Sequence, residues 1–97
     1  MSMDPENQDA FYQRLREELM RTSRWPSVYL YKFIIPSEPA KIEQIGAIFD
    51  NTGAVIESRL SRNGKYTSLS ISVNLDSPDE VIAKYRQVGE IDGVISL

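Results

Sequence analysis

The spacing of apolar and polar residues divides this chain into short segments with two different periods. Between residues 9–24 the apolar residues recur every four positions, at Phe11, Leu15 and Leu19. This spacing places them on one face of an α-helix and leaves the charged residues on the other faces. Residues 1–8 are polar and show no period, so we expect a flexible N-terminus before the helix.

An alternating pattern, typical of a β-strand, follows at residues 27–35. Pro26 disfavours α geometry at Trp25, which separates this strand from the preceding helix. Burying an unpaired ammonium group is costly, so we expect Lys32, and the alternate residues that share its face of the strand, to face solvent. The opposite parity, which should face the core, consists of Tyr29, Tyr31, Phe33 and Ile35.

A second helical pattern begins at Pro39, where a proline loses nothing by lacking an N–H group. Its apolar stripe consists of Ile42, Ile45, Ile48 and Phe49. Gly46 lies inside this helix at a cost of about 0.5–1 kcal/mol relative to alanine, so we expect a close packing contact there. Gly53 can adopt the left-handed conformation that ends a helix.

Two further strand patterns, at residues 54–61 and 66–76, flank the dipeptide Asn63-Gly64. This dipeptide favours a two-residue type I′ turn, in which both residues have positive φ. Such a turn would place Ile56 opposite Ile71, so that the apolar residues of both strands share one face. The sequence therefore predicts a hairpin with one buried and one polar face.

The last part of the chain adds one helix and one strand. The segment Ser77-Pro78-Asp79-Glu80 has the pattern of a helix-capping box. The apolar stripe that follows consists of Val81, Ile82, Tyr85 and Val88. Gly89 should end this helix, and residues 93–97 have the composition of a final strand.

The predicted order is strand, helix, strand, strand, helix, strand, preceded by one extra helix. This order is that of a ferredoxin-like βαββαβ fold of the α+β class, a two-layer sandwich with a four-stranded antiparallel sheet. Both of its helices should cover one face of the sheet. We therefore divide the chain into a flexible N-terminus at 1–8, an N-terminal helical extension at 9–24 and a ferredoxin-like domain at 25–97.

The 97 residues contain no cysteine and no histidine, which narrows the possible chemistry. Without these residues the chain lacks disulfides, thiolate catalysis, the usual general base near neutral pH and the usual ligands for zinc or copper. We therefore expect a protein that is not an enzyme and has no metal or other cofactor. No apolar run approaches the ~20 residues that cross a bilayer, and no leader pattern opens the chain, so we expect a cytoplasmic protein.

The open face of the predicted sheet is the candidate binding surface. The candidate residues are Lys32, Arg59, Arg62, Lys65, Ser68 and Ser70. A sheet face that merely contacts water would look similar, and basic hairpin tips are usually solvated. However, the apolar residues beside this polar panel (Leu30, Ile34 and Val55) offer a protein partner or a second copy of the chain something to bury. Alternatively, the N-terminal helix could fold over this face.

Two other functions remain open at this point. Arg59, Arg62 and Lys65 could hold a small anionic metabolite, although the hairpin lacks the glycine-rich sequence of a phosphate-binding turn. Recognition of single-stranded RNA is the less favoured alternative. The formal charge of -3 and the serines that follow Tyr66 on the open face argue against nucleic acid.

Three segments resemble the YbeD-like bacterial family of unknown function: WPSVYLYKF at 25–33, SRNGKYTSLSI at 61–71 and IDGVISL at 91–97. The resemblance implies a ferredoxin-like fold similar to that of the ACT-like regulatory domains, which bind amino acids. It implies no established catalytic activity. The segment at 36–39 has the acidic residue of an ACT ligand loop but not its glycine. Our leading interpretation is a small regulatory or protein-docking module, with an ACT-like sensor of a small anionic metabolite as the alternative.

Overall fold

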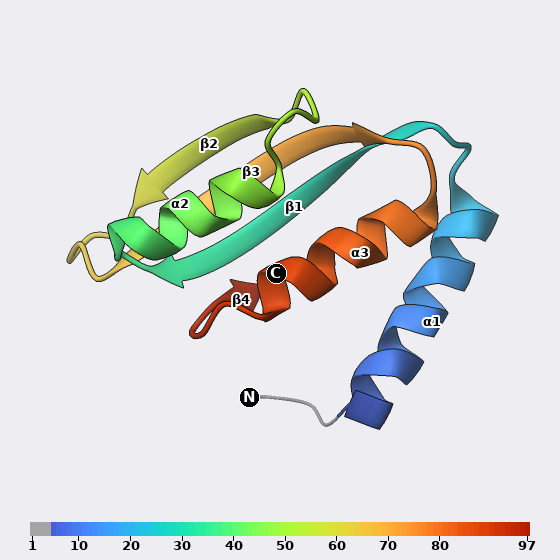
Figure 1. Ribbon diagram of the computed structural model, residues 1–97, viewed down its shortest axis with the longest axis horizontal. Helices are drawn as coiled ribbons and strands as arrows, with labels where there is room; N and C mark the ends of the chain where they lie inside the picture. Colours follow the sequence, from blue (N-terminus) through green and yellow to red (C-terminus); the bar gives the residue numbers. More distant parts are fainter. Residues whose placement is uncertain (1–4) are drawn as a thin grey trace.

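The computed structural model describes residues 5–97 and contains three helices and four strands (Figure 1). Their bounds are α1 Pro5–Thr22, β1 Ser27–Pro36, α2 Pro39–Ile48, β2 Val55–Leu60, β3 Tyr66–Leu75, α3 Pro78–Gly89 and β4 Ile95–Ser96. The strands form one sheet in the order β2-β3-β1-β4, and all three pairings are antiparallel. This is the predicted ferredoxin-like arrangement, with both crossover helices on one face.

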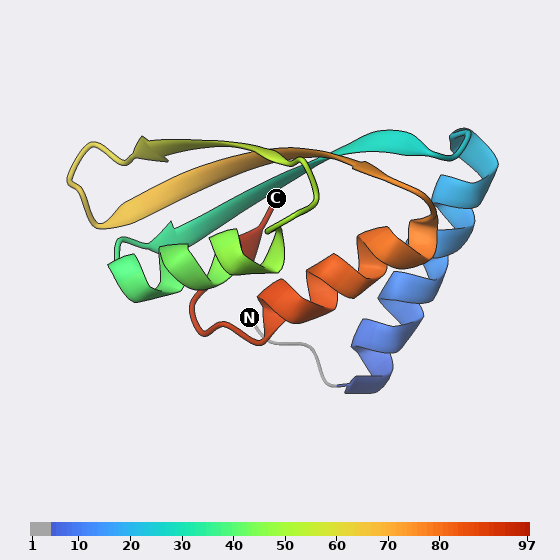
Figure 2. The same cartoon turned by 45° about the horizontal axis from the view of Figure 1, so that its top comes forward.

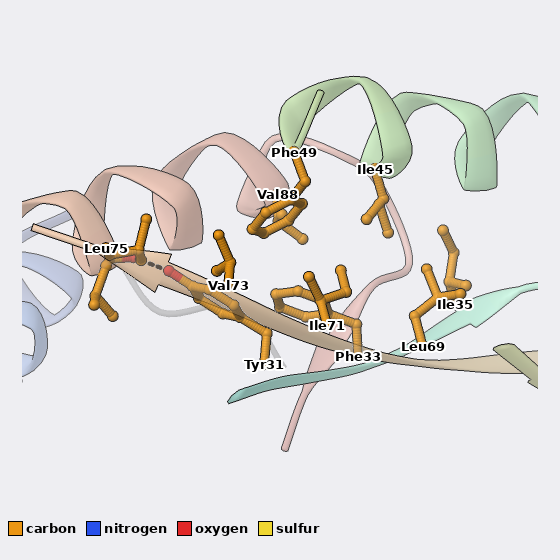
Figure 3. Close-up of a cluster of buried hydrophobic side chains, with 11 residues drawn as sticks. Tyr31, Phe33, Ile35, Ile45, Phe49, Leu69, Ile71, Val73, Leu75 and Val88 are labelled. Atoms are coloured by element: carbon orange, nitrogen blue, oxygen red, sulfur yellow. Dashed lines mark hydrogen bonds between the residues drawn. The ribbon is translucent and has the colours of Figure 1, made fainter. Parts of the chain in front are cut away.

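The core lies between the sheet and the helices, which all lie on the same side of it (Figure 2). Tyr31, Phe33 and Ile35 of β1 are completely buried, which confirms the predicted parity of this strand. Figure 3 shows these side chains facing those of α2 and α3. The remaining buried members of the cluster are Ile45, Phe49, Leu69, Ile71, Val73, Leu75, Val81 and Val88. The face of β1 that carries Lys32 therefore points away from the helices.

The core holds the buried Tyr31, and the partly buried Tyr85 packs against it; the hydroxyl groups of both have partners. The Tyr31 hydroxyl donates to the carbonyl of Val81 at 3.0 Å, as the dashed line in Figure 3 shows. The hydroxyls of Tyr85 and Tyr29 are 2.9 Å apart. Because both hydroxyls have a hydrogen bond, the two rings can pack in or against the core without an unsatisfied polar atom. Tyr85 is therefore a structural residue of the core.

α1 begins at Pro5, so the prediction of a flexible end was wrong for residues 5–8, while residues 1–4 lie outside the part that the structure describes. Asn7 and Asp9 are polar and exposed, and an exposed polar turn of a helix shows no apolar period. α1 packs beside α3 and does not cover the open face of the sheet (Figures 1 and 2). Ion pairs of Arg16 with Asp79 at 2.6 Å and of Arg86 with Asp9 at 2.9 Å join the two helices at their surface.

The hairpin between β2 and β3 has the predicted register but a different turn. Ile56 pairs with Ile71, as expected. Of the two turn residues, only Gly64 has positive φ, at +76°, and its N–H donates to the carbonyl of Ser61 at 2.9 Å. The Asn63 side chain accepts a hydrogen bond from the Lys65 N–H at 3.0 Å. This local bond favours a wider loop over the predicted type I′ turn.

β4 is much shorter than the predicted strand at 93–97. The carbonyl of Lys32 accepts from the N–H of Leu97, so the even-numbered residues of β1 direct their backbone groups toward β4. Pro36 is one of these residues and has no N–H to donate, which ends the pairing. Gly93 has φ of +84°, so the chain also turns away there.

Two glycines of the α2 region behave differently. Gly53 is left-handed as predicted, with φ of +76°, but it does not end the helix, because α2 already ends at Ile48 and Asn51 is the first left-handed residue after it. At Gly46, apart from its chain neighbours and the backbone of its own helix, no atom of residues 5–97 lies within 4 Å of the position that a Cβ would occupy. The close packing contact predicted at Gly46 is therefore wrong, and this glycine has no steric reason to be there.

Candidate functional site

The candidate site lies on the open face of the sheet, where three neighbouring strands bring polar side chains together. Lys32 of β1 is paired with Ser70 of β3, and Ser70 is paired with Glu57 of β2 on its other side. Arg59 of β2 is paired with Ser68 of β3. Since paired residues point to the same face, these five side chains form one panel, which we call the serine panel.

The serine panel contains a hollow of about 420 Å³. Its lining includes Lys32, Glu57, Arg59, Ser68, Ser70 and Leu97. Four of the six candidate residues predicted from the sequence thus border one hollow. The polar side chains that line it lie on the open face, and the helices of residues 5–97 are on the other side of the sheet (Figure 2).

The two cations of the panel have no partner within the described part of the chain. The ion pairs formed within the described residues use Arg16, Arg21, Lys41 and Arg86. Lys32, Glu57 and Arg59 make no side-chain hydrogen bond or ion pair among residues 5–97. The ammonium and guanidinium groups are therefore available to an external anion, for which a guanidinium offers a two-pronged hydrogen-bond donor.

Exposed apolar side chains surround the panel. Leu30 of β1 is 52% exposed, Val55 of β2 is 62% exposed and Leu97 is 72% exposed. Ile95 of β4, also exposed, is paired with Ile34 and so shares this face. The sequence pattern did not identify Ile95 and Leu97 as part of the site. Their parity depends on the register of β4 against β1, and this register becomes visible only in the folded sheet.

Arg62 and Lys65 lie apart from the panel, in the loop between β2 and β3. Neither residue lines the hollow. The backbone of Lys65 has a structural role, because its carbonyl accepts from the N–H of Ser37 at 2.9 Å. The structure therefore separates these two candidates from Lys32, Ser68 and Ser70.

A second hollow, of about 260 Å³, lies between α1 and α3 and was not predicted. It is lined by Gln8, Tyr12, Arg86, Gly89 and Glu90. The guanidinium of Arg86 lies 4.8 Å from the centre of the Tyr12 ring and also pairs with Asp9. The Arg86 guanidinium of α3 thus contacts two side chains of α1, so we assign this hollow a structural role.

The titratable groups of the core do not reach the panel. Burial raises the pKa of the Tyr31 phenol, and the neighbouring Tyr29 and Glu80 act in the same direction. Burial also raises the pKa of Tyr85, as does its hydrogen bond with Tyr29. Both phenols therefore remain protonated near neutral pH and serve packing. Within residues 5–97 no three acidic side chains gather as metal ligands would, and none of the helices is long and apolar enough to cross a membrane.

Comparison with known proteins identifies the family. The model of a family described as a protein of unknown function (DUF493) matches residues 20–97. The match includes the whole sheet and both crossover helices, so the chain belongs to this family. No curated protein and no solved structure matched the chain.

Proposed function

We propose that this protein is a non-catalytic docking module that binds a segment of another protein on the open face of its sheet. The segment would present a carboxylate to Lys32 and Arg59 and place apolar side chains on the surrounding residues. The observation that carries the proposal is the pair of unpartnered cations in one hollow, surrounded by exposed apolar side chains.

The energetics favour such a mixed ligand. A carboxylate bound to Arg59 and Lys32 would form charge-assisted hydrogen bonds, which are about twice as strong as neutral ones. The apolar side chains add more, because complete burial of a valine or leucine contributes roughly 1.5–3 kcal/mol. A solvated sheet face has no need for Leu30, Val55, Ile95 and Leu97 on the same side.

The family resemblance agrees with this proposal but adds little chemical detail. Membership in a family of unknown function is consistent with the likeness to YbeD-like proteins, whose fold is similar to that of ACT-like regulatory domains. A regulatory role in the cytoplasm, in which binding of this module changes the activity of its partner, follows naturally from a docking function without catalysis. We include that role in the proposal.

A small anionic metabolite is the second candidate ligand. The same hollow supports it, because Lys32 and Arg59 border a volume of about 420 Å³. In this version the ligand lies in the serine panel and not at the hairpin, since Arg62 and Lys65 do not line the hollow. RNA has less support. Two of the aromatic rings that could stack on bases, Tyr29 and Tyr31, point toward the helices.

The test is an affinity capture from native lysate with matched charge reversals. Lys32→Glu and Arg59→Glu change the hollow, and Arg62→Glu makes the same change of charge outside it. We expect the first two variants to lose partners that the wild type and Arg62→Glu retain. Cross-linking and mass spectrometry should then map the contact to a partner segment with an acidic residue between apolar residues.

Equal capture by all variants, or a mapped segment without an acidic residue, would show that the docking proposal is wrong. Thermal shift measurements distinguish binding of a small metabolite from docking of a protein segment. Stabilisation of the wild type, but not of Lys32→Glu, by an amino acid or organic acid at millimolar concentration would favour the sensor function over protein docking.

A further inference from the structure

The outer edge of β2 is free and fully exposed. β2 lies at one end of the sheet order, and Figure 1 shows no other element beyond it. All of its residues are exposed. The Ser61 N–H donates to the carbonyl of Tyr66, so the odd-numbered residues direct their backbone groups toward β3. Ile56, Ser58 and Leu60 therefore direct theirs outward, and those groups have no partner among residues 5–97.

The sequence of this edge is complementary to itself. In an antiparallel pair of two β2 strands centred on Ser58, Glu57 lies opposite Arg59 of the second copy, and Arg59 lies opposite its Glu57. Both pairs would be on the open face. On the other face, Ile56 would lie opposite Leu60 of the second copy. These apolar side chains are 41% and 63% exposed in the single chain.

The hydrogen-bonding pattern agrees with the same register. The outward backbone groups of Ile56, Ser58 and Leu60 would meet those of Leu60, Ser58 and Ile56 of the second copy. Two bonds at each of these three pairs make about six in all. Glu57 and Arg59 then occupy positions without hydrogen bonds, where opposite side chains come closest.

The neighbouring registers are less stable because they place like charges opposite each other. Moving the centre to Glu57 would place two carboxylates opposite each other, and moving it to Arg59 would oppose two guanidinium groups. Like charges directly opposite each other on two strands are destabilising. The alternating charges therefore favour one register, which distinguishes this edge from one that carries charges only to prevent pairing.

We propose that a second copy of this chain pairs with β2 through this edge, centred on Ser58, and forms a continuous eight-stranded sheet. The two open faces would then lie on the same side of the dimer, so the dimer would present two serine panels to a partner. A single strand pair buries less than the ~1,200–2,000 Å² of a standard interface, so the dimer is weak and exchanges rapidly. Its formation does not depend on the docking function proposed above.

The absence of cysteine makes a cross-linking test specific. In the proposed dimer the two Ser58 Cα atoms would be about 5.5 Å apart, which is within the range of a disulfide. The matched control is Val55→Cys, because the two Val55 residues would be six positions apart along the paired strands, or about 20 Å. We expect Ser58→Cys to form a disulfide dimer at least about tenfold faster than Val55→Cys under mild oxidation.

Charge reversal tests the register. Adding Glu57→Arg to Ser58→Cys should slow cross-linking by about tenfold, because the symmetry of the dimer introduces the repulsion twice. Adding Arg59→Glu as well should restore the original rate. Equal cross-linking of the Ser58→Cys and Val55→Cys variants, or no restoration by the double reversal, would overturn the proposal.

Different experiments test the dimer proposal and the docking proposal, so one can be wrong while the other holds. Lys32→Glu lies outside β2 and should leave the cross-linking rate unchanged while it removes partner capture. Loss of cross-linking with this variant would show that the pairing involves the open face and not the edge of β2. In that case the proposed register would be wrong.

Discussion

Gly46 and Gly64 differ in whether their backbone conformation requires a glycine. Gly46 lies within α2, and no side chain of the described residues beyond its chain neighbours comes within 4 Å of the place that a Cβ would take. Gly64 has φ of +76°, a conformation that side chains other than glycine adopt only at a cost. The same substitution should therefore change stability in opposite directions at the two positions.

We predict that Gly46→Ala raises the free energy of unfolding by about 0.5–1 kcal/mol, because alanine loses less backbone entropy in a helix. Gly64→Ala is the matched control and should lower it by about 1 kcal/mol or more. Denaturation in urea measures both changes. A destabilising Gly46→Ala would show that this position has a packing constraint that the structure lacks.

Tyr31 leads to a prediction about alkaline pH. Its pKa is raised in the folded state above its ordinary value of 10.0, so the unfolded chain loses this proton first as the pH rises. The stabilising contribution is thus complete below pH 10 and decreases above it. Tyr31→Phe should make the fall in unfolding free energy above pH 10 less steep. Urea denaturation between pH 8 and 11 tests this, and equal slopes for both proteins would contradict it.

At the scale of elements, α3 begins with a cap that the sequence predicted well. The Ser77 hydroxyl accepts from the N–H of Glu80 at 3.3 Å. The Glu80 carboxylate accepts from the N–H of Asp76 at 2.6 Å, one residue before the partner expected in a capping box. The start of α3 is thus stabilised by side chains next to it in the sequence.

We expect Ser77→Ala to lower the free energy of unfolding by about 1 kcal/mol through loss of this cap. Ser70→Ala on the open face is the control, and it should change stability by less than about 0.5 kcal/mol. Thermal or chemical denaturation of the two variants gives the comparison. If both variants lose the same stability, the cap at Ser77 does not contribute as proposed.

α1 contacts α3 through Tyr12, whose ring stacks near Tyr85 with a centroid distance of 6.2 Å and lies under Arg86. Its exposed ion pairs with α3 contribute little, since such pairs are typically worth about 0–1 kcal/mol. Tyr12→Ala should therefore increase amide hydrogen exchange throughout α1 by roughly tenfold or more. Phe11→Ala, next in sequence and 44% exposed, should have a much smaller effect. Similar exchange in both variants would refute this role of Tyr12.

At the scale of the whole molecule, the open face does not contribute to the core. The side chain of Lys32 makes no ion pair within residues 5–97 and points away from the helices. Lys32→Glu should thus change the free energy of unfolding by less than about 0.5 kcal/mol. Urea denaturation of this variant is also the control that the capture experiment requires, because lost binding must not reflect lost folding. A larger loss of stability would assign Lys32 a structural role.

Most of the fold could be predicted because the period of each element is a local property. The alternation in β1 assigned Tyr31 to the core and Lys32 to the open face before any tertiary contact was known. The turn type was predicted wrongly, yet the register of β2 and β3 was correct. A register shifted by one residue would have moved Ile56 and Ile71 to opposite faces, so the apolar pattern was enough to specify it.

Within the site, local pattern was informative only in part. Parity alone indicated that Lys32, Arg59, Ser68 and Ser70 share one face, and the structure brings them to one hollow. Arg62 and Lys65 lie beyond the last strand pair of β2 and β3 and do not line this hollow. The contribution of Ile95 and Leu97 depends on the register of β4.

The sequence by itself determined the order of the elements and the face to which each side chain points, because these follow from periods of two and 3.6 residues. Only the tertiary structure decided where α1 lies, how far β4 extends and which charges remain unpaired. The physical reason is that these features depend on residues distant in the chain. Arg16 meets Asp79, and Pro36 ends the pairing with β4. No local period contains that information.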